Sequence, residues 1–251
     1  MLSYEMKHAI FNKRMLISIL LSFLCLIVGS ADILFDHNSN IDFSYLFLFS
    51  YSCGTASLLA LIYPVFACMP YGDTYAVERE SGYLLYKRTK IHNVKYILIK
   101  LLSSSISGGL ALSIPVACYL ILCIFSRGPM LTDYGMEYIS HKVQFYHSQP
   151  VLYCAGFIGN AFLCGVIFSL LALALSVFIK SRYLVLFLPL VLYILCNILC
   201  SSHLFYLNPV LWWDCNLYSE SNELVVLGIE LGALLLFSII FSYGVIRNAK
   251  E

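Results

Sequence analysis

The chain has 251 residues, of which 61% are hydrophobic and only 12% are charged. An average globular chain is about half apolar and about one quarter charged, so this composition and a mean hydropathy of +0.84 indicate a membrane protein. The formal net charge of +1 is uninformative, because in membrane proteins the position of the charges matters more than their sum, and we expect no nucleic-acid binding. Nine of the ten cysteines fall in apolar stretches and no CxxC occurs, which argues against a disulfide framework and against a zinc site.

The N-terminal residues 1–14 predict a short amphipathic helix on the inner membrane surface, with apolar Leu2, Met6 and Ile10 and with polar Glu5, Lys7, Lys13 and Arg14. The alternative is a solvated tail that acts as a positive anchor. The apolar run Met15–Leu34 follows and is too long for the apolar region of a cleavable signal peptide.

Six apolar segments are long enough to cross a bilayer, which takes about 20 residues of helix. The sequence therefore predicts an all-α membrane protein with a single transmembrane domain over 1–251. The expected spans are 15–34, 43–69, 96–125, 152–179, 183–200 and 224–246, with a cytoplasmic segment at 70–95.

The basic residues then set the orientation of these spans. All of the 15 lysines and arginines except Arg127 and Lys142 fall at the termini, in the loop after the second span or in the short junction Ile179–Tyr183. Because cytoplasmic loops carry the excess of Lys and Arg, we expect a multi-pass protein of the cell membrane with both termini in the cytoplasm.

The cytoplasmic segment contains the densest cluster of charge, YAVERESGYLLYKRTK at 75–90. We predict a helix over Thr74–Glu80, a left-handed residue at Gly82 that ends it, and a second short helix over Tyr83–Arg88. The second helix is too short to be stable alone and is apolar enough to dock on a cytoplasmic protein. The alternative is an interfacial loop whose basic residues bind anionic lipid.

The outer loops contain two segments with predicted structure. The loop Ser126–Pro150 predicts a helical turn around Tyr134–Val143. The last loop contains Asn208, Pro209 and the only two tryptophans, Trp212 and Trp213. Tryptophan favours the headgroup level, so this segment is interpreted either as an interfacial anchor or as an outer-gate or exit segment for a substrate.

Glu230 is the only acidic residue well inside a predicted span. An intramembrane acid is a functional candidate, although near the interface it can also reach water or bond a neighbouring helix. It lies between Gly228 and Gly232, a spacing that lets helices approach closely.

Several classes of catalytic site are missing from the sequence. There is no GxxxxGK[ST] phosphate loop, no HExxH and no pair of intramembrane carboxylates. We therefore expect no enzyme activity, no metal site and no cofactor bound by this chain.

The order of elements and the sequence Glu78-Arg79-Glu80-Ser81-Gly82 after the second span resemble the type-two ABC exporter permeases, which have the type V fold. In that family a glutamate and a glycine precede a short coupling helix that sits in a cleft of a separate ATPase. A basic residue near the start of the third span completes the pattern, and Lys95 and Lys100 both match it. Asn208-Pro209 and the aromatics after it resemble the family's re-entrant segment.

The resemblance implies a permease dimer, formed with a second identical or different permease chain, and two copies of an ATPase subunit that bind ATP and Mg. It assigns the ATPase contact to Glu78, Arg79, Glu80, Gly82, Tyr83 and Leu84, with Lys7 and Lys13 nearby. The apolar, aromatic spans favour amphipathic or hydrophobic cargo, such as the toxin peptides moved by phenol-soluble modulin exporters. Export of drugs or lipids, or a membrane binding or immunity protein with no transport cycle, are the alternatives.

Overall fold

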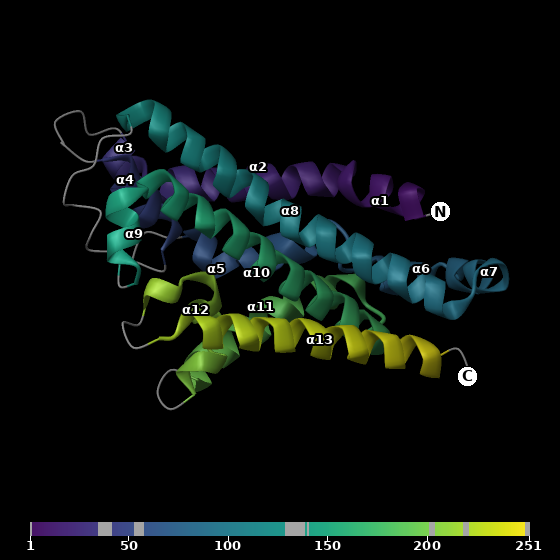
Figure 1. Cartoon of the computed structure of the whole chain (residues 1–251). Helices are drawn as coiled ribbons and strands as arrows, with labels where there is room; N and C mark the ends of the chain where they lie inside the picture. Colours follow the sequence, from purple (N-terminus) through teal and green to yellow (C-terminus); the bar gives the residue numbers. More distant parts are fainter. Residues whose placement is uncertain are drawn as a thin grey trace.

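The computed structural model describes residues 2–34, 42–52, 58–128, 139, 141–200, 204–217 and 221–248, and within these ranges the regular structure is helical. The longest helices are α8 (Asn93–Arg127), α10 (Pro150–Phe178) and α13 (Glu223–Arg247), which run side by side along the bundle (Figure 1). Among the described residues, five segments are long and apolar enough to cross a membrane, namely Tyr4–Gly29, α8, α10, α11 (Arg182–Leu199) and α13.

The helix bounds agree with the predicted spans to within a few residues, except in the second span. That span contains α4 (Phe43–Tyr51) and α5 (Leu58–Cys68), and residues 53–57 between them lie outside the described part. The first span contains α2 (Lys13–Gly29) followed by the short helix α3 (Ala31–Leu34).

The N-terminal helix was predicted over 1–14 and is observed as α1 (Leu2–Ile10). Asn12 separates α1 from α2. Its side chain accepts a hydrogen bond from the backbone N–H of Arg14 and so caps α2. The predicted turn around Tyr134–Val143 lies mostly outside the described residues, and the short helix α9 (Val143–Ser148) begins at its end.

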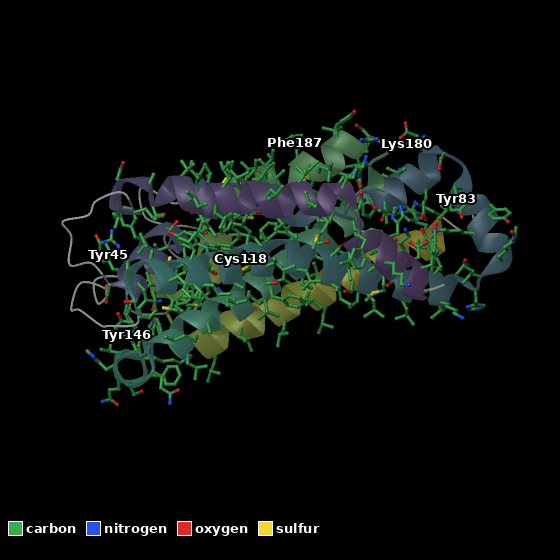
Figure 2. The ribbon with its side chains drawn as sticks, turned by 90° about the horizontal axis from the view of Figure 1, so that it is seen from above. Tyr45, Tyr83, Cys118, Tyr146, Lys180 and Phe187 are labelled. Carbon is green, nitrogen blue, oxygen red and sulfur yellow. The ribbon has the colours of Figure 1, made fainter. Side chains whose placement is uncertain are left out.

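The bundle has two distinct ends. Both chain ends lie at one of them, together with α6 (Thr74–Glu80) and α7 (Tyr83–Lys90), and we call this the terminal end (Figure 1). The opposite end, called the distal end, carries α3, α9 and α12 (Pro209–Trp213). Figure 2 shows Tyr83 and Lys180 at the terminal end and Tyr45 and Tyr146 at the distal end. The predicted cytoplasmic and outer segments are therefore sorted to opposite ends.

Small residues let the two central helices touch. A Cβ added at Gly165 of α10 would lie 2.3 Å from the carbonyl oxygen of Gly108 on α8, so only glycine fits there. Next to this contact, the Ser104 and Ser169 hydroxyls hydrogen-bond each other at 2.7 Å. Serines and glycines at such positions are typical of helices packed within membranes.

The outer helices present apolar side chains to the surroundings. Leu235, Ile239 and Tyr243 of α13 and Phe187 of α11 are all exposed. A soluble protein buries such a stripe, whereas a helix that faces lipid exposes it. The GxxxG pair predicted to allow close packing lies on α13 in open space, because a Cβ at Gly228 or Gly232 meets no atom within 4 Å.

Candidate functional site

The predicted pair of short helices is present at the terminal end. The helix α6 ends at Glu80, and Gly82 adopts a left-handed conformation with φ of 72° before α7 begins at Tyr83. The left-handed residue reverses the chain between the two helices, which glycine does without the steric cost that other residues carry. The local structure of this segment was therefore predictable from the sequence.

Replacing Gly82 by alanine is expected to loosen α7. An added Cβ meets no atom within 4 Å, so the cost comes from the left-handed backbone alone and is about 1–2 kcal/mol. Amide hydrogen exchange in α7 should become roughly fivefold faster or more. Gly228→Ala is the control, since it lies inside a helix in open space and should leave α7 unchanged. Equal exchange in wild type and Gly82→Ala would show that the turn does not hold α7.

Four charged side chains from four different helices meet beneath this turn. We call Glu5 of α1, Glu78 of α6, Lys87 of α7 and Lys100 of α8 the charge cluster. Glu78 Oε1 lies 2.6 Å from Lys87 Nζ and 2.7 Å from Lys100 Nζ. Glu5 forms an ion pair with Lys87, and a longer one of 3.5 Å with Lys100. Two acids and two bases balance one another, so the cluster has no net charge.

Two tyrosine hydroxyls complete the hydrogen bonding of the charge cluster. Tyr71 donates to Glu5, and Tyr96 donates to Glu78 Oε2 at 2.7 Å. Lys100 in turn donates to the Tyr71 oxygen at 2.9 Å. Buried charges are tolerated when they are paired and fully hydrogen-bonded in this way.

Burial and the neighbouring charges shift the pKa values of Lys87 and Tyr71. Burial alone lowers the pKa of Lys87, but hydrogen bonds from its ammonium to Glu5 and Glu78 outweigh burial, so the pKa is raised above its usual value. Burial and the neighbouring Glu5 carboxylate raise the pKa of Tyr71, which stays a neutral donor. At neutral pH Lys87 is therefore charged and Tyr71 is neutral.

The two lysines near the start of the third span have different surroundings. Lys100 is only 1% exposed and lies in the charge cluster, whereas Lys95 is exposed on the same helix. Glu5 and Lys87 were not predicted as members. The one signal for Glu5 was its position four residues before Ala9, which places both on the buried face of α1.

A second ion pair fixes the start of the α6–α7 segment. One Arg14 guanidinium nitrogen lies 2.9 Å and 2.8 Å from the two carboxylate oxygens of Asp73, the residue before α6. At the other end of α6, Arg79 donates to the carbonyl oxygen of Val177 in the last turn of α10 at 2.6 Å. That carbonyl has no partner within its own helix, and a cation is favoured there by the helix dipole.

The predicted contact residues divide into inward and outward groups. Glu78 and Arg79 make the bonds described above, and Leu84 is buried against the core. Glu80, Gly82 and Tyr83 are exposed. Tyr83 and Tyr86 are 50% and 53% exposed, stack on each other with ring centroids 5.9 Å apart, and have Lys87 and Lys90 over their rings. We call Tyr83, Tyr86 and Lys90 the α7 face.

A cavity of about 510 Å³ lies beside the charge cluster, lined by residues of α1, α6, α7 and α8 and by the segment between α5 and α6. Both acids of the cluster, both lysines and Arg14 contribute to its wall. Among the described residues, no group of three or more His, Cys, Asp and Glu side chains is placed to hold a metal ion.

The segment around the tryptophans folds back into the bundle at the distal end. The Asn208 side chain caps α12 by accepting a hydrogen bond from the backbone N–H of Val210, and Pro209 occupies the first position of this helix. Trp213 is 0% exposed and stacks between Tyr51 and Tyr63, with centroid distances of 4.6 Å and 4.5 Å. The interpretation of the tryptophans as an interfacial anchor is therefore wrong, because both indoles are buried among protein side chains.

Glu230 lies far from the charge cluster, in the second turn of α13 at the distal end. Its side chain is buried and lines a separate pocket with residues of α9, α10 and the turn after α12. The structure thus places the predicted site residues in three separate regions: the α6–α7 segment, α12 and the Glu230 pocket. Comparison of the chain with protein-family models, with curated proteins and with solved structures gives no match.

Proposed function

We propose that the chain is the membrane-spanning permease subunit of an ATP-driven exporter, and that α7 docks on a separate ATPase in the cytoplasm. The observation that carries the proposal is the combination of an exposed aromatic and basic α7 face with a buried charge cluster beneath it. A short helix with no role outside the chain needs neither an exposed pair of tyrosines nor a buried cluster of four charged groups at its base.

The charge cluster gives a physical route from α7 to the spans. A displacement of α7 moves Lys87, which forms an ion pair with Glu78. Glu78 also pairs with Lys100 of α8. The helix α8 in turn packs directly on α10 through Gly108 and Gly165. Buried packed elements of this kind move between discrete arrangements rather than deforming continuously. ATP binding by a partner would thereby bias the bundle between inward and outward access.

The proposal includes a dimer of permease chains, two ATPase subunits and six spans, with the second span formed by α4, α5 and the residues between them. Amphipathic peptides are the proposed cargo, because the spans are rich in aromatic and aliphatic residues. ATP and Mg would be bound by the ATPase.

The proposed orientation predicts the location of the C-terminus. A green fluorescent protein fused after residue 251 should fluoresce, and alkaline phosphatase fused there should be inactive, since the C-terminus is expected in the cytoplasm. Fusions within 129–138 should give the opposite result. An active phosphatase at the C-terminus would contradict the orientation and remove the ATPase from reach of α7.

The function is tested by co-expression with a P-loop ATPase encoded in a neighbouring reading frame. The ATPase is expected to co-purify with the chain, and inverted vesicles should take up a fluorescent amphipathic peptide only with ATP. Alanine at both Tyr83 and Tyr86 should weaken co-purification at least tenfold, because exposed aromatics dominate such interfaces. Tyr243→Ala, at an exposed tyrosine of α13, is the control. Unchanged co-purification and uptake in the double variant, or uptake without ATP, would contradict the proposal and favour a membrane binding protein without a transport cycle.

A further inference from the structure

A pocket of about 240 Å³ lies at the distal end between α9, α10, α13 and the turn after α12. It is separated from the α7 face by the length of the bundle (Figure 1). Its wall is largely apolar and aromatic, with Phe145, Leu152, Phe157, Val226 and Leu227 among the lining residues. A few polar groups interrupt this wall, which is the usual composition of a small-molecule site.

Glu230 is the buried acidic side chain of this pocket. The residue is 2% exposed, and its Oε1 is a buried oxygen without a hydrogen-bond partner among the described residues. Leaving a carboxylate oxygen unpartnered in an apolar wall is costly, whereas a bound cation or donor would recover much of that cost. The uncompensated group therefore points to a ligand.

The other charged groups of the pocket balance each other. Lys142 and Glu223 form an exposed ion pair with each other, so neither offsets the charge of Glu230. The neutral polar groups of the wall include Tyr153, Asn160 and Asn216, and Asn160 is already bonded to the Trp212 and Trp213 carbonyl oxygens at 2.8 Å and 2.7 Å. With Glu230 ionised, the described lining therefore has a net charge of −1, which repels anions.

We propose that this pocket binds an ammonium group attached to a small apolar body, with the ammonium on Glu230. The aromatic side chains Phe157 and Tyr153 also line the pocket, and an aromatic ring can attract the same cation. A volume of about 240 Å³ is below that of sites for drug-sized ligands, which start near 300 Å³, so the ligand or the part of it that enters is small. Both a free arylalkylamine and the amine headgroup of a lipid have this chemistry. The inference does not depend on the proposed ATPase.

The free-ligand arm uses the full chain purified in dodecyl maltoside, a detergent without ammonium groups. Calorimetric titration with 4-phenylbutylamine should give saturable binding, and 4-phenylbutanol should bind at least tenfold more weakly. Glu230→Gln should lose amine binding by a similar factor. The matched control is Asp32→Asn, which removes an exposed carboxylate outside the lining residues and should bind like wild type.

A second pair of variants tests the site without touching its charge. A Cβ at Gly156 or Gly159 of α10 meets no atom within 4 Å, yet only Gly156 lines the pocket. Gly156→Leu should therefore block amine binding, and Gly159→Leu should leave it intact. The lipid arm adds phosphatidylethanolamine or phosphatidylglycerol to the delipidated chain and counts bound lipids by native mass spectrometry.

Each outcome decides the question. Amine binding that needs Glu230 and is unaffected by phosphatidylethanolamine assigns the pocket to a free amine, whereas competition by phosphatidylethanolamine assigns it to a lipid headgroup. Equal binding of 4-phenylbutylamine and 4-phenylbutanol overturns the proposal. The proposal is also overturned if both Glu230→Gln and Gly156→Leu still bind 4-phenylbutylamine. It is overturned as well if the wild-type chain binds neither 4-phenylbutylamine nor phosphatidylethanolamine. If the wild-type chain binds the amine but exports no peptide with ATP, the result would contradict the exporter proposal and leave the pocket proposal standing.

Discussion

Replacing Lys100 by methionine is expected to reduce the free energy of unfolding by about 3–5 kcal/mol, because one half of a buried ionic pair is removed. Methionine fills much the same volume, so the loss is electrostatic. Glu78 would lose its contact of 2.7 Å, and the two acids of the cluster would share a single lysine. Reversible unfolding in mixed dodecyl maltoside and dodecyl sulfate micelles measures the change.

Lys95→Met provides the matched control, since it removes an exposed lysine from the same helix and should change stability by less than about 0.5 kcal/mol. Adding Glu78→Gln to Lys100→Met restores the charge balance and should recover part of the loss. A Lys100→Met variant as stable as Lys95→Met would show that the charge cluster does not stabilise the terminal end.

Replacing Trp213 by alanine is expected to cost about 3 kcal/mol, the low end of the range for large aromatic residues in protein cores. In lipid the transfer term is weak, so the cost comes from the cavity, the lost ring stacking and a lost hydrogen bond. The indole stacks on Tyr51 and Tyr63, and its Nε1 donates to the Tyr51 carbonyl oxygen at 2.9 Å.

Free thiols report this change directly. Cys68, Cys123, Cys154 and Cys164 carry buried thiols, so a thiol-reactive fluorophore labels them only as the bundle opens with heat. Trp213→Ala should lower the labelling midpoint clearly, and Trp213→Phe, which keeps a stacked ring, should lower it less. Equal midpoints for wild type and Trp213→Ala would place the indole outside the packed core and restore its role as an interfacial anchor.

Much of the fold follows from local sequence signals. Long apolar runs set α8, α10, α11 and α13, and Gly82 set the boundary between α6 and α7. These features depend on neighbouring residues in the chain, so hydropathy and one glycine were enough to predict them. The serine and glycine pairs that join α8 to α10 follow no local sequence signal, because their partners lie more than 50 residues away.

The candidate site was harder to predict for the same reason. The charge cluster joins Glu5 to Lys87 and Lys100 across most of the N-terminal half, and no spacing rule links such residues. The sequence predicted tryptophans at the membrane interface, because amphipathic indole rings favour the headgroup region in general. Here Asn208 and Pro209 start a short helix that turns the indoles into the protein, where tyrosine rings and backbone carbonyls satisfy them.

Photo-crosslinking in native membranes tests directly whether an ATPase binds the α7 face. Benzoylphenylalanine at Tyr86 places the reactive group on that face, and at Phe187 it places the same group on the exposed side of α11. If an ATPase docks on the α7 face, position 86 should form an adduct with a protein whose peptides include a phosphate-binding P-loop. Position 187 should form no such adduct. Adducts at 86 with lipid alone, or with a protein that lacks a P-loop, would contradict this docking.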